Sequence, residues 1–372
     1  MIRRKKPVLN LFGKIILIFN YIATLALLIS YLAPITNPNS FWLIPFFGLA
    51  YPAFLLINIA FIIFWLLYRK SLFSLISLVA ILGGYNFIAK YVGFRESSAI
   101  EVPKSSENFI RVMTYNVHNF KRYEDKLNDI FTKDEILNII RKEQPDILCI
   151  QEFLSRPKSD YNFKELLKEI LNTKYYYFKP DMDNGYEAIG MAIFSKFPIK
   201  KSDNIHFDDS ANGALFSDIE YKNKLFRIYN VHFQSISFQP EDYKYIKEVK
   251  GIEADVTSSR RIGSRLKGAF KKRSNQISQI KDHASKCLIP YVIAGDFNDT
   301  PISYAVNEMS SGLVNSFYEK GSGLGVTYNG DFPNFQIDYI LATKNFEVKN
   351  YRIVKKELSD HYAVRSDLEW NK

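Results

Sequence analysis

Residues 293–301 read IAGDFNDTP, and this stretch decides the fold that we predict for the chain. The apolar run that leads into it, 289–294, predicts a buried strand that stops at Gly295. Three polar side chains follow within four residues: Asp296, Asn298 and Asp299. A strand that ends in this way delivers fixed oxygen and nitrogen groups to the rim of a cleft, where metal and phosphate chemistry needs them. An ordinary polar turn is the alternative interpretation, because Gly, Asp and Asn are common turn residues.

The same arrangement recurs at the ends of other predicted strands. Apolar or alternating segments predict strands at 109–117, 146–150, 188–195, 214–220, 224–233, 336–342, 346–354 and 361–368, and helical spacing predicts helices at 133–143, 163–171, through most of 241–285 and near 302–310. Polar residues lie at or near the edges of these strands: Asn116, Glu152, His232, Asp296, Asn298, Asp338, Asp360 and His361. We therefore expect an α/β fold with two sheets packed face to face and helices outside.

These eight residues suit one kind of chemistry. A carboxylate such as Glu152 can hold a hard divalent cation. A histidine paired with a carboxylate can act as an acid or a base, or bind a phosphate oxygen. Asparagine side chains can orient a phosphate group or the attacking water. Any one of the eight has an ordinary structural explanation, but together they predict metal-assisted hydrolysis of a phosphate ester.

The N-terminal third of the sequence has a different composition. No charged residue occurs from Ile15 to Leu67, and a membrane span needs roughly 20 apolar residues. We predict three transmembrane helices, near 11–33, 42–67 and 71–89. The apolar region is too long for a cleaved signal peptide and lacks an obvious cleavage site, so we expect a retained, multi-pass anchor in the lipid bilayer.

The basic residues predict the orientation of this anchor. Four basic residues lie within 3–6, and Arg69 and Lys70 follow the second span, whereas the loop at 34–40 is uncharged. Positive flanks stay in the cytoplasm, which places the N-terminus there. If the third stretch crosses the membrane, the rest of the chain is extracytoplasmic, on the periplasmic side of a bacterial inner membrane. If that stretch lies along the interface, the rest of the chain is cytoplasmic.

The charge of the chain must be divided in the same way. Residues 1–95 hold nine of the 49 Lys and Arg residues and none of the 39 Asp and Glu residues, so 96–372 has a net charge of +1. The basic character of the whole chain therefore says little about a polyanionic partner for the C-terminal part. Cys149 and Cys287 are flanked by apolar residues, which favours buried free thiols.

The order and spacing of the strand-end blocks resemble the endonuclease/exonuclease/phosphatase family. The matching blocks are VMTYNVHNF, DILCIQEF, IYNVHFQS, VIAGDFNDTP, QIDYIL and SDHYAV, and the resemblance covers about 108–370. It implies a four-layer α/β sandwich with the site at one edge of two sheets. We thus divide the chain into a transmembrane region at 1–90, a linker at 91–107 and a catalytic domain at 108–370.

The resemblance implies a magnesium ion, with Mn²⁺ as an alternative, and no organic cofactor. Glu152 would be its principal ligand, with Asn116 beside it and Asp360 close by. His361, oriented by Asp338, would be the acid or base of the reaction.

Further roles follow from the same resemblance. Asp296 and Asn298 would position the attacking water and the phosphate, and His232 would contact the scissile phosphate. Glu187 is the candidate carboxylate partner of His232. One departure is Gln336, where the family commonly has arginine, which would remove a cation near the phosphate pocket.

The sequence leaves three functions open. A membrane-anchored, metal-dependent phosphodiesterase that acts as a nuclease is the leading hypothesis. A phospholipid-directed phosphodiesterase of the sphingomyelinase kind is the second, and an inactive anchored binding module is the third. Seven basic residues and no acidic residue lie within 260–273, which suits nucleic acid, anionic lipid or a solvated helix face. No protein partner is indicated.

Overall fold

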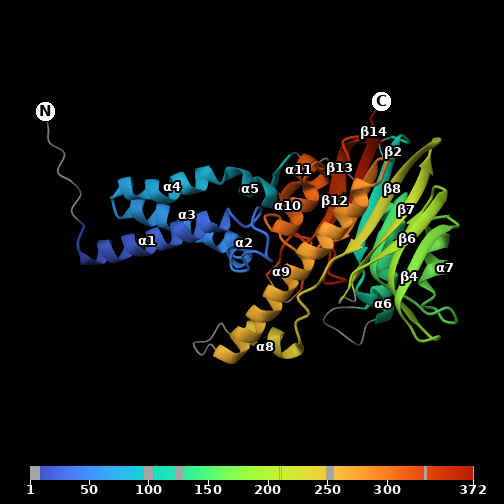
Figure 1. The fold of residues 1–372 in the computed structure, drawn as a ribbon, viewed down its shortest axis with the longest axis horizontal. Helices are drawn as coiled ribbons and strands as arrows, with labels where there is room; N and C mark the ends of the chain where they lie inside the picture. Colours follow the sequence, from blue (N-terminus) through green and yellow to red (C-terminus); the bar gives the residue numbers. More distant parts are fainter. Residues whose placement is uncertain are drawn as a thin grey trace.

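The structure is a computed structural model that describes residues 9–95, 104, 106–121, 129–208, 210, 212–248, 255–330 and 333–371. The N-terminal helical unit extends to one side of a larger α/β unit (Figure 1). Its elements are α1 (Leu11–Ser30), α2 (Ile44–Leu49), α3 (Tyr51–Leu67), the 3-10 helix η1 (Ser71–Phe73), α4 (Ser74–Gly83) and α5 (Tyr85–Tyr91). Helices α1, α3 and α4 lie side by side, and the turn at Arg69 and Lys70 lies at the tip far from the α/β unit (Figure 1).

The helices differ from the predicted spans in where they break. The first predicted span, 11–33, contains α1, which alone among the described helices is long and apolar enough to cross a membrane by itself. The second, 42–67, is divided at Ala50 between α2 and the 17-residue α3, because Pro52 opens a new helix there. The third, 71–89, becomes η1, α4 and α5, with a bend of 62° at Gly84. A bent pair of this kind can form one span or a re-entrant segment.

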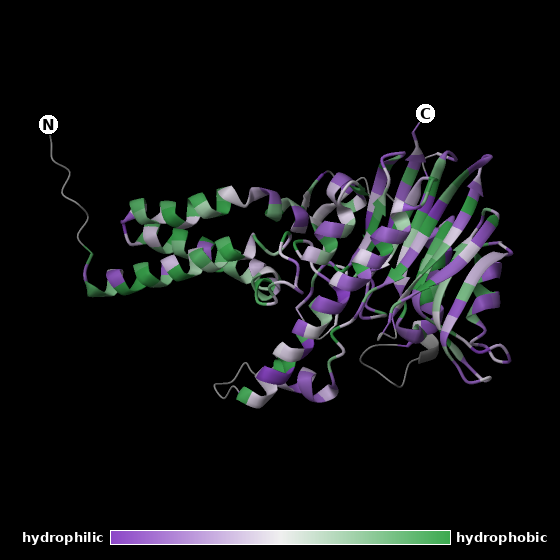
Figure 2. Cartoon of the chain, in the orientation of Figure 1, coloured by the Kyte–Doolittle hydropathy of each residue, from purple (hydrophilic) through white to green (hydrophobic). Residues whose placement is uncertain are grey.

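The helical unit has polar groups inside and apolar groups outside. Asn20, Asn58 and Ser77 are fully buried between α1, α3 and α4. Asn20 Nδ2 donates to Ser77 Oγ at 2.7 Å, and Ser77 Oγ donates to Asn58 Oδ1 at 2.8 Å. Trp65 Nε1 donates to Asn20 Oδ1 at 2.8 Å. Figure 2 shows that these helices are largely hydrophobic along their length. Large apolar side chains face outward, since the following are all at least half exposed: Phe12, Ile18, Phe19, Ile22, Leu25, Leu56, Ile63, Leu66, Val79 and Leu82.

The C-terminal unit is the predicted four-layer α/β sandwich. One sheet has the order β10-β12-β9-β8-β7-β6, and the other has the order β13-β14-β2-β3-β5-β4. Their strands are β2 (Phe109–Asn116), β3 (Ile147–Ser155), β4 (Tyr175–Asp183), β5 (Ala188–Ser195), β6 (Ile199–His206), β7 (Gly213–Tyr221), β8 (Lys224–His232), β9 (Tyr291–Asp296), β10 (Val314–Asn315), β12 (Asp338–Ala342), β13 (Phe346–Val354) and β14 (Ala363–Trp370).

Helices cover the outer face of each sheet. The described helices of this unit are η2 (His118–Phe120), α6 (Asp129–Glu143), α7 (Phe163–Ile170), α8 (Pro240–Glu248), α9 (Val256–Ser285), α10 (Tyr304–Ser310) and α11 (Ser316–Lys320). Helices α6 and α7 pack on the sheet that contains β3, and α9 and α10 pack on the sheet that contains β9. Both cysteines are free, and Cys149 is buried whereas Cys287 is half-buried.

Strand β9, which leads into the motif at 293–301, shows why the strands are continuous apolar runs. Along β9, Val292 and Ala294 pack in the core between the two sheets, whereas Ile293 packs against the outer helices. Successive side chains of a strand point to opposite faces, and here both faces are buried. A strand covered on both sides therefore requires apolar residues at every position until it reaches the edge of the sheet.

One buried ion pair joins neighbouring strands within the sandwich. Arg111 on β2 is the cross-strand partner of Asp367 on β14. Its Nε and Nη2 donate to the two Asp367 carboxylate oxygens at 2.6 and 2.8 Å, and both side chains are almost fully buried. Arg365 Nε lies 2.5 Å from Glu143 Oε2 beside this pair. The charges are thus paired inside the fold.

The two units are joined by direct contacts as well as by the chain. Residues 91–107 were predicted as a linker, but Val92–Phe94 forms a short strand, β1, antiparallel to β11 (Ser322–Leu324). Residues 96–103 and 105 of that predicted linker lie outside the described residues. Asn39 Nδ2 donates to Asn275 Oδ1 at 2.9 Å, and the Phe46 ring meets the Phe270 ring edge to face at 5.3 Å.

Candidate functional site

Strand register brings the predicted site residues to one edge of both sheets. His232 at the end of β8 is the parallel partner of Asp296 at the end of β9. Asp338 at the start of β12 is the antiparallel partner of Asp296. Asn116 ends β2 in the facing sheet, and its Nδ2 lies 3.3 Å from Asp296 Oδ2, which links the two sheets at this edge.

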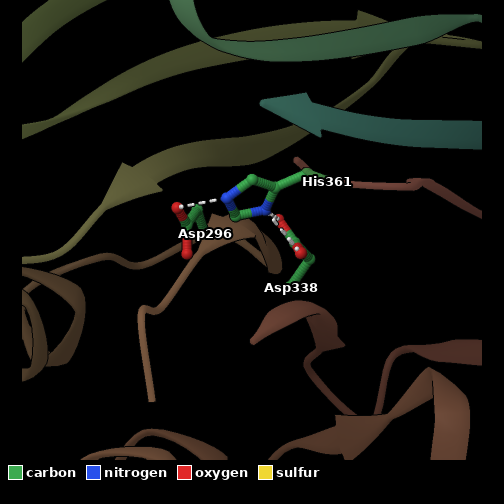
Figure 3. Close-up of side chains that lie close together, drawn as sticks. All are labelled: Asp296, Asp338 and His361. Carbon is green, nitrogen blue, oxygen red and sulfur yellow. Dashed lines mark hydrogen bonds and ion pairs between the residues drawn. The ribbon is translucent and has the colours of Figure 1, made fainter. Parts of the chain in front are cut away.

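His361 lies between two buried carboxylates (Figure 3). Its Nδ1 is 3.0 Å from Asp338 Oδ2, and its Nε2 is 3.6 Å from Asp296 Oδ2. Burial disfavours the protonated imidazole, but the charges of Asp338, Asp296 and Asp360 outweigh it and raise the pKa of His361 well above its ordinary value. The arrangement is that of a histidine oriented by one carboxylate and directed at another.

Asp296 and Asn298 form a rigid turn at the end of β9. Asp296 Oδ1 accepts the Asn298 backbone N–H at 2.8 Å, and its Oδ2 accepts Asn298 Nδ2 at 3.0 Å. Gly295 has φ +153°, and a Cβ there would lie 2.0 Å from the Val231 carbonyl oxygen. Glycine is therefore required directly before Asp296. Burial and the neighbouring Asp338 raise the pKa of Asp296, although His361 and His232 oppose the shift.

A second group of oxygen atoms surrounds His118. Glu152 sits with φ +51° where the pairing of β3 with β5 shifts register, which turns its side chain to the cleft. Asn116 Nδ2 donates to Glu152 Oε1 at 3.1 Å. His118 Nδ1 lies 3.5 Å from Glu152 Oε2 and 3.7 Å from Asp360 Oδ1. The three residues predicted to hold a metal, Glu152, Asn116 and Asp360, are thus brought together.

The electrostatics of this group favour ionised oxygens. Burial opposes ionisation of Glu152, but the hydrogen bond from His118 and the charge of His232 outweigh it and lower the pKa of Glu152 to about 2. Burial likewise opposes protonation of His118, yet Glu152 and Asp360 raise its pKa. Two carboxylates and an amide oxygen match the ligands that a hard divalent cation prefers.

Asp296, Asp338 and His361 also meet the distance requirement for a metal site, since their ligand atoms lie within 4.8 Å of one another. In that group His361 Nδ1 is already hydrogen-bonded to Asp338, so one of its two ring nitrogens is occupied.

Sequence reasoning missed His118. It belongs to the quoted block VMTYNVHNF but follows the end of the predicted strand, and a lone histidine outside a strand end carries little signal. The backbone of His118, Asn119 and Phe120 has positive φ throughout, at 44°, 56° and 58°. This unusual turn places the imidazole beside Glu152, and no pattern of side chains predicts it.

Two other predictions about side chains differ from the structure. Glu187 pairs with Arg156, whose Nη2 lies 2.7 Å from Glu187 Oε2, whereas the carboxylate nearest to His232 Nε2 is Asp296 at 3.6 Å. Gln336 does not line the cleft with the site residues. It is buried beside Phe317 and Tyr339 in a separate cavity of about 190 Å³.

The basic segment within 260–273 lies on α9 and is largely engaged by the protein itself. Arg261 and Arg265 pair with Asp242 at 2.6 and 3.0 Å. Arg273 is buried and pairs with Asp299 at 2.8 Å. Lys267 Nζ lies 4.3 Å from the centre of the Trp42 ring. These contacts favour the solvated-face and structural interpretations of the segment over a patch for nucleic acid.

The site residues line a cleft of about 350 Å³. Its polar end contains Asn116, His118, Glu152, His232, Asp296, Asn298, Asp360 and His361. The rest of its lining mixes apolar side chains, including Leu266 and Phe270 of α9 and Leu49 of α2, with the polar residues Ser235, Ser237, Arg273, Asp299 and Thr300. The cleft thus combines titratable side chains with apolar ones.

Comparisons with known proteins agree with this geometry. The model of the Endonuclease/Exonuclease/phosphatase family matches residues 113–361. Residues 13–91 match a second model, described as "Domain of unknown function (DUF8431)". No curated protein matches the chain.

Several solved structures share the fold of the α/β unit. An endonuclease/exonuclease/phosphatase from Beutenbergia cavernae is 19% identical, with a TM-score of 0.52 over 71% of this chain and 72% of that chain. The human Nocturnin catalytic domain with bound sulfate is 21% identical, with a TM-score of 0.51 over 71% and 94%. An endonuclease/exonuclease/phosphatase from Bacteroides vulgatus is 19% identical, with a TM-score of 0.50 over 71% and 99%. At these identities the likeness concerns the fold alone.

Proposed function

The chain belongs to the endonuclease/exonuclease/phosphatase family of hydrolases that act on phosphate esters, and we propose that it is a membrane-anchored, divalent-metal-dependent phosphodiesterase. The observation that carries the proposal is the convergence of strand ends from both sheets at one cleft. A histidine–carboxylate pair, a second carboxylate and an oxygen-rich group all face the same space. Phosphoester hydrolysis uses this combination of groups.

The proposed metal ligands are Glu152, Asp360 and Asn116, with His118 beside them. The ionised Glu152 and the mixed oxygen set fit Mg²⁺, and Mn²⁺ accepts the same ligands. When bound, such a cation polarises a phosphoryl oxygen and stabilises the charge that develops on it. Asn116 also donates to Asp296, so it fixes the metal ligands relative to the rest of the site.

The remaining residues would handle water and protons. In the hydrolysis, a water oxygen bonds to phosphorus, one P–O ester bond breaks, and the proton lost by water is balanced by one gained by the leaving alcohol. Asp296 and Asn298 lie where they can orient that water and a phosphate oxygen, and His232 can donate to the phosphate. His361, held by Asp338, would act as the acid or base.

Membrane anchoring is supported by the reversed polarity of the helical unit. In water, a helix bundle buries apolar side chains and exposes polar ones, whereas here Asn20, Asn58 and Ser77 are buried and the outer surface is apolar. We propose that α1, α3 and the bent pair α4–α5 cross or enter the bilayer. The turn at Arg69 and Lys70 would face the cytoplasm and the catalytic unit would lie on the opposite, extracytoplasmic side.

The test of the proposed chemistry uses the full chain in non-ionic detergent. Hydrolysis of bis(4-nitrophenyl) phosphate should require added Mg²⁺ or Mn²⁺ and stop with a chelator. Glu152→Gln should weaken Mn²⁺ binding measured by calorimetry about 10- to 100-fold and lower activity with it, because a charged ligand is lost. Glu165→Gln, on the exposed surface of α7, is the matched control. Equal activity in wild type and Glu152→Gln, with or without metal, would contradict the proposal.

Glu187→Gln tests whether Glu187 serves as the carboxylate partner of His232, as the sequence predicted, or only pairs with Arg156, as in the structure. Because Glu187 pairs with Arg156, its replacement should change activity far less than Glu152→Gln does. A loss as large as that of Glu152→Gln would restore Glu187 as a partner of His232.

A further inference from the structure

The lining of the cleft has two chemically different parts. The strand-end side chains that we propose bind the phosphate line one part of it. The rest of the lining has seven large apolar side chains, Leu49, Ile236, Phe238, Leu266, Phe270, Phe335 and Ile337, together with the polar residues Ser235, Ser237, Arg273, Asp299 and Thr300. An apolar wall of this size beside a phosphate site does not suit a polyanion, because it would desolvate charged groups without pairing them. It suits a molecule with an ester phosphate at one end and hydrocarbon at the other.

One part of this wall comes from the N-terminal helical unit. Leu49 ends α2, and α2 is held on the catalytic unit by the edge-to-face contact of Phe46 with Phe270. The helical unit therefore does more than precede the catalytic unit in the chain. It completes the cleft.

The segment that leads into α2 carries exposed apolar side chains. Ile35 is 72% exposed and Phe41 is 52% exposed, and Trp42 and Leu43 are each more than two-fifths exposed. The segment between α1 and α2, which contains these residues, lies at the end of the helical unit that meets the catalytic unit (Figure 1). Aromatic and aliphatic residues at such a position are typical of the membrane–water interface. Leu49, which lines the cleft, thus follows closely in the chain after a segment whose exposed surface suits lipid.

We infer that the substrate is an amphiphilic phosphodiester of the membrane, with its phosphate at the polar end of the cleft and a hydrocarbon chain against Leu49, Leu266 and Phe270. This inference rests on the proposed phosphodiesterase function and names its substrate class. The contacts of α9 support it over nucleic acid, because Arg261, Arg265 and Arg273 are paired within the protein. The reaction is the hydrolysis described above, and the alcohol that leaves is one of the two substituents of the phosphate.

The test compares two soluble substrates that differ only in chain length, 4-nitrophenyl methyl phosphate and 4-nitrophenyl hexyl phosphate. With the full chain in non-ionic detergent and Mg²⁺, the hexyl ester should have a kcat/KM at least about tenfold above that of the methyl ester, because the added methylenes leave water. Leu49→Asn and, on a separate element, Leu266→Asn should each lower this ratio toward one. A partial loss of folded protein does not change a ratio of rates.

Leu288→Asn is the matched control, because Leu288 is 99% exposed and lies outside the cleft. Its ratio should equal that of the wild type. An equal kcat/KM for both esters in the wild type overturns the inference and leaves the phosphodiesterase function standing. The inference is also overturned if Leu49→Asn and Leu266→Asn lower kcat/KM by the same factor for both esters. Wild-type protein that cleaves plasmid DNA without preferring the hexyl ester assigns the cleft to nucleic acid.

A binding measurement separates this inference from the proposed activity. Hexyl phosphate should bind at least about tenfold more tightly than methyl phosphate in calorimetric titrations of the wild type, and Leu49→Asn should reduce the difference. If neither ester is hydrolysed, the phosphodiesterase proposal fails, and equal binding of the two phosphates then overturns the substrate class as well.

Discussion

His361 is the residue on which the proposed chemistry depends most directly. Its Nδ1 is hydrogen-bonded to Asp338, which fixes the orientation of the ring, and its Nε2 lies 3.6 Å from Asp296 Oδ2. We expect His361→Gln to lower kcat about 10²- to 10⁴-fold, the usual contribution of a positioned acid or base. Hydrolysis of bis(4-nitrophenyl) phosphate by the full chain measures the effect. His283→Gln, at a histidine that contacts Tyr229 away from the cleft, should retain activity. Equal losses in the two variants would contradict the assignment.

Gln336 provides a prediction about stability. Its side chain is buried, and neither amide atom has a hydrogen-bond partner among the described residues. An unsatisfied buried amide costs about 1–3 kcal/mol, so Gln336→Met should increase the free energy of unfolding by about 1 kcal/mol. The thermal unfolding midpoint of the detergent-solubilised chain checks this.

Gln276→Met is the matched control for Gln336→Met. Gln276 is equally buried, but its Oε1 accepts the Gln234 backbone N–H at 2.8 Å. Its replacement leaves that donor unpaired and should lower the unfolding midpoint. A fall in the midpoint for both variants would show that Gln336 has a partner, such as a bound water.

At the residue scale, the sequence predicted which side chains meet but not all of their partners. Once the order of the strands is known, the fold brings their ends to one edge of the two sheets. The proximity of Asp296, Asp338 and His361 therefore followed from the sequence blocks that contain them. His118 depends on a run of positive φ angles, and Glu187 depends on where Arg156 lies. Neither property is encoded by spacing along the chain.

Among the elements, the pairing of β2 with β14 offers the sharpest test. Arg111→Met leaves Asp367 buried with its bidentate partner removed, and we expect a loss of about 3–5 kcal/mol in the free energy of unfolding. The double variant Arg111→Met/Asp367→Leu should regain most of that loss, because both charges are then absent. Denaturant unfolding measures both variants.

Lys200→Met supplies the comparison for the buried pair. Lys200 pairs with Glu220 at 2.8 Å, but both side chains are substantially exposed, so its loss should cost no more than about 1 kcal/mol. If Arg111→Met costs no more than Lys200→Met, the buried pair does not contribute as the structure indicates.

The elements that sequence reasoning missed share a physical cause. Strands β4 and β6 lie at the outer edges of the two sheets and carry many exposed polar residues, so the apolar pattern that marks the central strands is weak there. The predicted spans were continuous because composition alone does not show where a helix bends. The prolines of α2 and α3 and the pair Gly83 and Gly84 decide those breaks.

For the whole molecule, the main prediction concerns orientation. Figure 1 places the turn at Arg69 and Lys70 at one tip of the helical unit and the catalytic unit at the other. An alkaline phosphatase reporter fused after Lys372 should therefore be active in a bacterial host, and one fused after Lys70 should be inactive. A fluorescent C-terminal green fluorescent protein fusion would place the catalytic unit in the cytoplasm and contradict the orientation.

The architecture of the α/β unit was predictable because the order of strands and the apolar pattern agree over its whole length. The relation between the two units was not. Contacts such as Asn39 with Asn275 and Phe46 with Phe270 involve ordinary residues whose pairing only the folded chain shows. These contacts also alter the chemical character expected of the cleft, because they bring the apolar Leu49 of α2 into its lining. The strand-end residues alone do not predict that contribution.

The short strand β1 has a consequence for how the enzyme would search for substrate. Val92–Phe94 follows α5 directly and is hydrogen-bonded to Ser322–Leu324, so the catalytic unit is fastened at the point where the chain leaves the helices. This pairing holds the catalytic unit against the end of the helical unit. In a bilayer, its encounters would then be governed by lateral diffusion in two dimensions. Its rate should follow the surface density of substrate in that leaflet rather than any bulk concentration.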